Sequence, residues 1–274
     1  MGAARRLDAG EKQRLSEDGF VLRRDVFDAA ELRAIRDDCE TLVNHLLAER
    51  RHTKHSVGSY MFELQRSLET IVKWEPGEPD LVQGVEPFAH LSEGLRRWAL
   101  DERLTEPAKD VVGGDDIILF TEKLNLKRAH KGGPIVLHQD FPYWKDLTEV
   151  APRVATAMLF LDDATRDNGC LEVVPGSHRE GLQARRQIDG FGSLEIDTER
   201  YDHSRLVALE VLAGAVVFFG PFLVHRSLPN RSGDDRRALL YSYQPTGYPH
   251  LRELTKLARE AAAGKDPNAP SQRS

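Results

Sequence analysis

The pattern of apolar residues changes its period about 115 residues into the chain. Before that point the spacing is mostly helical. Asp28 and Glu31 are spaced as a capping box, and an apolar stripe follows at helical intervals to about Glu49, which predicts one long amphipathic helix. The other elements predicted in this part are a helix over 11–17, a strand over 20–22 and a helix over 91–105 that ends near Pro107.

Beyond residue 115 the apolar positions follow the pattern of extended strands. The predicted strands cover 117–120, 124–126, 134–141, 154–161, 171–174, 206–211, 215–219 and 238–243. Gly, Pro, Asn and Asp turns separate these roughly eight strands, and no helices lie between them. Such an order favours an antiparallel sandwich or barrel over a parallel α/β sheet.

The remaining segments complete a single predicted domain over residues 1–264. Residues 50–80 have no clear period and are interpreted as a loop, with a lid over a pocket as the less common alternative. Residues 249–263 are expected to form a C-terminal helix that stops at Gly264, and the polar 265–274 to be a disordered tail. The domain would consist of a helix-rich part over about 10–110 and a β core over about 115–247.

Composition restricts the class of protein. The chain has 274 residues, 40% of them hydrophobic, and a net charge of −6 with no basic block, which argues against nucleic acid or an anionic membrane as a partner. Its two cysteines cannot form a disulfide framework or a four-thiolate metal site. No signal peptide or membrane span is expected, so we predict a soluble, cytoplasmic protein with a small-molecule partner.

The strand predicted over 134–141 carries the first candidate chemistry. His138 and Asp140 lie two residues apart, and alternate residues of a strand point to the same face. One imidazole and one carboxylate would supply two ligands of a 2-His-1-carboxylate site for non-haem Fe(II). Two other histidines compete for the third position. His225 follows an apolar strand and a Gly-Pro turn and is favoured over His178, which lies in a more exposed turn.

Arg236, eleven residues after His225, adds a second kind of candidate residue. A dicarboxylate cosubstrate such as 2-oxoglutarate would bind iron through its 2-oxo-acid end, and its far carboxylate would then need a cation. A guanidinium suits that position because it stays charged and pairs with a carboxylate bidentately. Ser227 and Asn230 are candidates for further hydrogen bonds, and Arg237 is expected to face outward.

Three segments resemble the phytanoyl-CoA dioxygenase family, a branch of the Fe(II)/2-oxoglutarate-dependent oxygenases. They are His138 to Trp144, Asn168 to His178, and His225 to Ser227 followed by Arg236, and the likeness spans roughly residues 15–247. The resemblance implies a mainly β fold with bracing helices around a double-stranded β-helix core, also called a jelly roll or cupin-like core. Three motifs in the order and spacing of the family are far more specific than a single His-x-Asp pair.

The resemblance also implies roles for individual residues. His138, Asp140 and His225 would hold iron, and Arg236 with Ser227 would bind the tail of 2-oxoglutarate. By similar position, Lys123 and Thr156 would also contact this cosubstrate. A carboxylate at 140 favours oxygenation with O2, because family members that halogenate have a small residue there.

The implied activity is that of a 2-oxoglutarate-dependent hydroxylase that releases succinate and CO2. Phe141, Tyr143 and Trp144 are candidates for the substrate wall, with core packing as the alternative for each. No large cationic patch for a CoA group is evident, which favours a small metabolite or natural-product intermediate over an acyl-CoA. Two competing interpretations stand beside this activity. One is a metalloenzyme with the same triad and no 2-oxoglutarate, such as a cupin-type dioxygenase or a zinc or manganese hydrolase, and the second is a non-catalytic jelly-roll binding protein.

Overall fold

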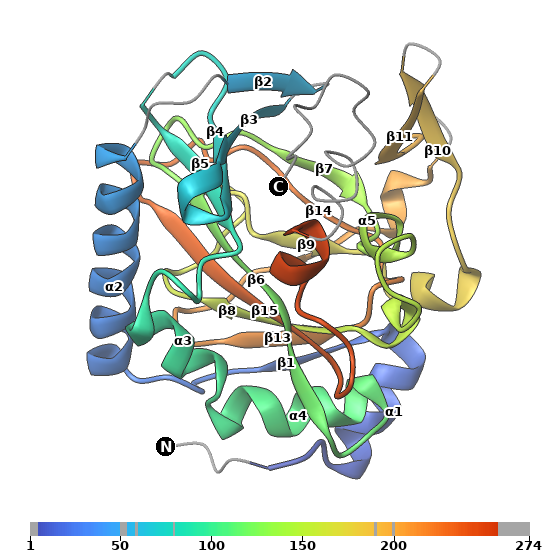
Figure 1. Cartoon of the computed structure of the whole chain (residues 1–274). Helices are drawn as coiled ribbons and strands as arrows, with labels where there is room; N and C mark the ends of the chain where they lie inside the picture. Colours follow the sequence, from blue (N-terminus) through green and yellow to red (C-terminus); the bar gives the residue numbers. More distant parts are fainter. Residues whose placement is uncertain are drawn as a thin grey trace, which may run out of the picture.

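Two antiparallel sheets form the frame of the protein (Figure 1). The computed structural model describes residues 5–49, 54–57, 60–78, 80–188, 191–198 and 201–256. The larger sheet contains, in spatial order, β1 (Phe20–Arg23), β13 (Val216–Phe219), β8 (Ala155–Phe160), β15 (Arg236–Pro245), β6 (Ile117–Lys127), β5 (Val82–Glu86), β4 (Thr70–Trp74), β3 (Tyr60–Gln65) and β2 (Lys54–Val57). The smaller sheet contains β10 (Arg185–Ile188), β11 (Phe191–Ile196), β7 (Ile135–His138), β14 (His225–Ser227), β9 (Leu171–Val173) and β12 (Val207–Leu209).

Helices cover one face of the larger sheet, as Figure 1 shows for α2. Those that contribute to the core on this face are α2 (Ala29–Ala48), α3 (Glu93–Ala99) and α4 (Glu102–Val112). The chain also forms α1 (Ala9–Asp18), α5 (Phe141–Trp144) and the 3-10 turns η1 (Arg66–Leu68), η2 (Ala151–Arg153), η3 (Ser177–Glu180) and η4 (His203–Arg205). Residues 251–256 are also helical. The fold is therefore mainly β with bracing helices, as the sequence predicts.

The long helix α2 begins where its capping box predicts. The Asp28 side chain accepts hydrogen bonds from the backbone N–H groups of Ala30 and Glu31, and the Glu31 side chain accepts one from the Asp28 backbone. The apolar stripe of α2 is buried in the main core with residues of α3, α4 and the larger sheet. Each fully buried aliphatic side chain contributes about 1.5–3 kcal/mol to folding, so the stripe fixes α2 on the sheet.

Residues 54–86 differ most from the sequence prediction. They form β2 to β5, which extend the larger sheet beyond β6, so the helix-rich description of residues 10–110 and the loop at 50–80 are wrong for this segment. In β4 the buried residues alternate with Ile71 and Lys73, which face a cavity. The polar side chains on that face conceal the strand pattern.

The helix predicted over 91–105 is two helices. The first helix, α3, ends with Leu100 as its C-cap residue. The Asp101 side chain then accepts a hydrogen bond from the Arg103 N–H and caps α4. Pro107, expected to mark a stop, lies inside α4, which continues to Val112 with one backbone donor missing.

At the C-terminal end the predicted helix is described only in part. It is confirmed over 251–256, while its predicted continuation to residue 263 and the predicted disordered tail at 265–274 lie outside the described residues. Among the described helices, none is both long enough and apolar enough to cross a lipid bilayer.

Candidate active site

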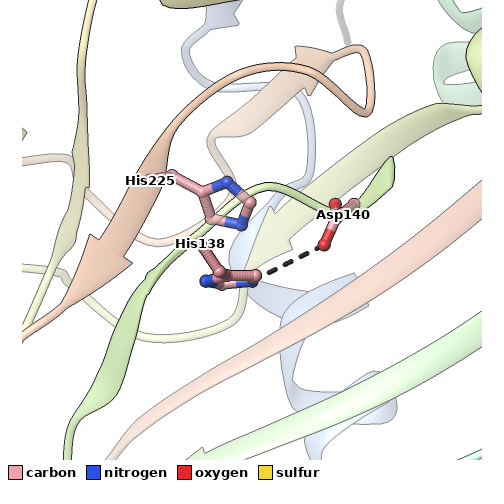
Figure 2. Close-up of side chains that lie close together, drawn as sticks. All are labelled: His138, Asp140 and His225. Atoms are coloured by element: carbon pink, nitrogen blue, oxygen red, sulfur yellow. Dashed lines mark ion pairs between the residues drawn. The ribbon is translucent and has the colours of Figure 1, made fainter. Parts of the chain in front are cut away.

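Three ligand-bearing side chains converge between the two sheets. His138 at the end of β7 and His225 at the start of β14 are paired residues on neighbouring strands, and their ring centroids lie 4.1 Å apart. The Asp140 Oδ1 atom lies 3.6 Å from His138 Nε2. One ligand atom from each of the three residues lies within 4.8 Å of the others, and Figure 2 shows the three side chains turned toward one another. No other such group of three occurs among the described residues.

Both histidines are oriented by the same local contact. The Nδ1 atom of His138 lies 2.8 Å from the Val136 carbonyl, and that of His225 lies 2.9 Å from the Leu223 carbonyl. A proton on each Nδ1 satisfies the carbonyl and leaves the lone pair of Nε2 free for a metal. The backbone two residues upstream therefore fixes the ring orientation that a metal site needs.

Asp140 reaches the site by a different route from the predicted one. Strand β7 ends at His138, and Asp140 has helical backbone angles at the start of α5, so strand alternation does not place its carboxylate. The buried Gln139 side chain holds the turn: its amide donates to the Gly181 and Phe222 carbonyls and accepts from the Gln183 N–H. Gln139 is not among the residues predicted for the site, although its place between His138 and Asp140 is a signal in the sequence.

The charges of the site suit a divalent cation. Burial and the neighbouring His138 lower the pKa of His225 to about 4, so this imidazole is neutral near pH 7. Burial alone would raise the pKa of Asp140, but His138, His225 and Lys123 beside it hold that pKa at about 2. Two imidazoles and a carboxylate on one side of an open site are the donor set of non-haem Fe(II) proteins.

A cavity of about 680 Å³ contains the three ligands, and Arg236 and Ser227 also line it. Arg236 is fully buried, and its Nη2 donates to the Gly169 carbonyl at 2.8 Å. Its Nε and Nη1 and the Ser227 hydroxyl have no hydrogen-bond partner in the described part of the chain. Unpartnered buried donors are costly, so this cluster fits an anion that accepts from both residues, such as a carboxylate.

The neighbours of Arg236 are engaged elsewhere. Arg237 points away from the cavity, and its guanidinium pairs with Asp162 and with Glu40 of α2. Asn230 does not supply the hydrogen bond proposed for it, because its amide donates to the carbonyls of Lys127 and Asp234. The free donors at this end of the cavity are therefore those of Arg236 and Ser227.

The two other candidates for cosubstrate contact have different positions. Lys123 on β6 lines the cavity, where its Nζ lies 3.0 Å from the Glu86 carboxylate. Thr156 on β8 is buried outside the lining, and its hydroxyl lies 2.9 Å from that of Ser242. The structure brings Lys123, but not Thr156, to the cavity surface.

The three aromatic residues after Asp140 also differ in whether they line the cavity. Tyr143 and Trp144 line the cavity. Phe141 turns away from it and stacks on Phe222 with ring centroids 4.5 Å apart. Phe141 is thus a packing residue, the alternative that the sequence left open.

Several cavity residues escaped the sequence analysis. Tyr60, Lys73 and Glu86 belong to the strands of residues 54–86, and they line the wall beside Lys123. No hydrophobic alternation in the sequence marks β4, because its buried face includes Thr70 and its cavity face includes Ile71. His178, the rival third ligand, lies in η3 against Gly19 and is not part of the ligand group.

The fold and the site define a jelly-roll protein with a candidate triad of metal ligands. The family model for phytanoyl-CoA dioxygenase (PhyH) matches residues 15–238, and the chain belongs to this family.

Relatives within the family differ in what their names say they act on. The chain is 32% identical over 154 residues to L-proline trans-4-hydroxylase from Streptomyces griseoviridis, a match to 50% of this chain and 57% of the relative. It is 40% identical over 120 residues to phytanoyl-CoA dioxygenase 1 from Oryza sativa subsp. japonica, covering 42% of this chain and 40% of the relative. The chain thus spans about half the length of the curated relatives it matches.

The fold is shared with a solved structure. EctD from S. alaskensis, with 2-oxoglutarate and 5-hydroxyectoine, superposes with a TM-score of 0.69 at 22% identity, over 89% of this chain and 77% of that one. The predicted jelly-roll, cupin-like core is confirmed.

Proposed function

We propose that the protein is an Fe(II)- and 2-oxoglutarate-dependent dioxygenase that hydroxylates an unactivated C–H bond of a small metabolite or natural-product intermediate. The observation that carries the proposal is the presence, in one cavity, of the ligand triad and a buried arginine with two unpartnered donors. A cupin-type or hydrolytic metalloenzyme without 2-oxoglutarate would leave Arg236 without a function. A purely structural role for the histidines leaves both the triad and these donors unexplained.

In this proposal His138, Asp140 and His225 would hold the iron. With 2-oxoglutarate and O2 bound, the iron would supply the oxidation: one oxygen atom would enter succinate as CO2 is released, and the other would enter the substrate as a hydroxyl group. The neutral His225 imidazole and the ionised Asp140 carboxylate would bind a metal without releasing protons.

Arg236 and Ser227 would bind the far carboxylate of 2-oxoglutarate. The guanidinium can donate a hydrogen bond from Nε or Nη1 to the carboxylate, and the Ser227 hydroxyl can donate another. Burial lowers the pKa of Arg236 to about 10, which still leaves it charged near pH 7. Met158, Leu171 and Phe219 line the same cavity and would exclude water from the reacting groups.

Membership of the family does not identify the substrate. Tyr143 and Trp144 are retained as candidates for its wall, and Lys123 as a candidate contact to the cosubstrate. An acyl-CoA remains the alternative substrate, because one relative is named phytanoyl-CoA dioxygenase. A cytoplasmic location stays an expectation from the sequence.

The proposal is tested by adding Fe(II) and 2-oxoglutarate to the protein without oxygen. We expect a weak metal-to-ligand charge-transfer absorption band that requires both additions. Folded protein that gives no band would contradict the assignment of the cosubstrate. Succinate release measured with L-proline, phytanoyl-CoA and a wider metabolite panel would then separate the small-metabolite and acyl-CoA alternatives.

A further inference from the structure

The outer wall of the cavity is built by the strands that extend the larger sheet. Its lining residues from β3 to β6 are Tyr60, Phe62, Leu64, Ile71, Lys73, Gly84, Val85, Glu86, Lys123 and Asn125. Two cations are thus set in a largely apolar surface. Lys73 has no role in the contacts assigned to the metal or the cosubstrate, whereas Lys123 is the candidate cosubstrate contact named above.

The two cations of this wall differ in their partners. Lys123 is neutralised by Glu86, 3.0 Å from its Nζ, and Glu86 also accepts a hydrogen bond from the Thr121 hydroxyl. Lys73 forms no ion pair within 4.0 Å among the described residues. Its Nζ instead lies 3.6 Å from the centre of the Tyr60 ring. A cation–π contact of this kind offsets only part of the cost of removing an ammonium group from water.

Space is available beside the Lys73 side chain. In the register of the sheet, Gly84 of β5 lies between Lys73 of β4 and Asn125 of β6. A Cβ atom at Gly84 would lie 3.1 Å from the Leu124 carbonyl oxygen and 3.9 Å from the Lys73 Cβ, so any side chain here would fill the surface between Lys73 and Asn125. The glycine therefore leaves the surface beside the base of the Lys73 side chain unfilled.

We propose that this wall selects a substrate with an apolar body and an anionic end, and that Lys73 binds that end. The inference rests on the proposed function, because it assigns the substrate of the same cavity. Phe62, Leu64 and Ile71 would contact the apolar body, and the ammonium of Lys73 would pair with a carboxylate or phosphate. Arg236 remains assigned to the cosubstrate.

The ionisation of Lys73 favours a ligand that carries a negative charge. Burial and the neighbouring Lys123 lower the pKa of Lys73 to about 7, so without a ligand the amine is ionised in only part of the molecules near neutral pH. An anion beside Nζ would favour the ammonium form. Lys123 is less suited to this role, because Glu86 already occupies one side of its Nζ.

The test compares ligands that share a carbon body and differ only in the end group. The probes are 3-phenylpropanoate and hexanoate, each paired with its primary amide, and calorimetry without oxygen measures their Kd for protein loaded with Fe(II) and saturating 2-oxoglutarate. We expect at least one carboxylate to bind the wild-type protein about tenfold more tightly than its amide. In Lys73→Met the two Kd values should agree within about twofold, and Lys73→Arg should restore part of the preference.

Lys131→Met is the matched control, because Lys131 is an exposed lysine paired with Glu78 outside the cavity. It should keep the wild-type preference. Equal affinities in the wild-type protein, no binding by any probe, or a preference that survives in Lys73→Met would overturn the inference. The charge-transfer band separates the two proposals: if it forms in wild-type protein and in Lys73→Met, failure of the probe experiment contradicts only the role of Lys73.

Discussion

Two neighbouring arginines on opposite faces of β15 differ in how fully their guanidinium groups are hydrogen-bonded. On the face that packs against the helices, Arg237 pairs with Asp162 and Glu40, and the Tyr241 hydroxyl donates to the Leu95 carbonyl. On the face toward the smaller sheet, Arg236 is fully buried, yet its Nε and Nη1 atoms have no hydrogen-bond partner among the described residues. The two arginines are consecutive in sequence and equal in chemistry, so only their surroundings distinguish them.

The difference separates residues that serve stability from residues that serve binding. A buried charge whose partners are all in the chain holds elements of the fold together. A buried charge with free donors adds a desolvation cost that folding alone does not compensate, and a ligand can supply the missing partner. The comparison therefore predicts that substitutions on the cavity face change activity first, and substitutions on the helix face change stability first.

The largest effect is expected at the ligand triad. Asp140→Ala and His225→Ala should each lower succinate formation at least about a thousandfold, equivalent to ~4 kcal/mol of transition-state stabilisation, because two ligands hold iron poorly. Iron content after gel filtration and succinate by mass spectrometry measure the outcome. His178→Ala is the control and should keep its iron. Loss of iron in His178→Ala would contradict the assignment of the third ligand.

The adjacent arginines give the most direct test of the comparison. Arg236→Met should weaken 2-oxoglutarate binding by about 30- to 1,000-fold, the effect of losing a buried charge pair worth ~2–4 kcal/mol. The same change should leave the thermal stability of the ligand-free protein equal or higher, because it removes an incompletely paired charge.

Arg237→Met should show the reverse. It should lower the free energy of unfolding by about 1–2 kcal/mol and leave the Kd for 2-oxoglutarate unchanged. Titration of the charge-transfer band and thermal unfolding measure the two quantities. If both variants lose stability and neither loses affinity, the two faces do not differ as proposed.

Tyr241→Phe sharpens the comparison on the helix face. It removes one buried hydrogen bond, from the Tyr241 hydroxyl to the Leu95 carbonyl at 2.9 Å, without changing the packing of the ring. We expect a loss of about 1 kcal/mol in the free energy of unfolding, measured with urea, and wild-type succinate formation. A fall in turnover at unchanged stability would run against this division of the sheet.

The smallest effect is expected at Thr156. Its hydroxyl contacts Ser242 and does not reach the cavity surface. Thr156→Val should therefore change the Kd for 2-oxoglutarate by less than about threefold, under ~1 kcal/mol. A tenfold or larger loss of affinity would restore the cosubstrate contact that similarity to the family implies.

The sequence predicts the elements whose signal is local. The capping box at Asp28 and Glu31 places α2, and the family motifs identify the triad and Arg236. The strands at 54–86 escape prediction because their cavity face carries Lys73 and Glu86 where a core face would carry apolar residues. Alternation of apolar and polar residues identifies a strand that lies between the core and solvent. It does not identify a strand that lies between the core and a cavity.

Contacts between distant segments explain the remaining differences. Asp140 reaches the site because Gln139 binds the backbone of Gly181 and Phe222, about forty and eighty residues away in sequence. No pattern around residue 140 could predict those partners. For the same reason the direction of Phe141 was open: it is set by Phe222 from another loop.

The pairing of His138 with His225 on adjacent strands has a thermodynamic consequence. Since sheet hydrogen bonds hold these residues in register, the two imidazoles keep their spacing as long as β7 and β14 stay together. A metal bound there is linked to the folding equilibrium of the smaller sheet: at a thousand times its Kd it would add about 4 kcal/mol to stability. We therefore expect chelation to lower the unfolding temperature of the whole sheet, with metal release and strand separation occurring as one transition.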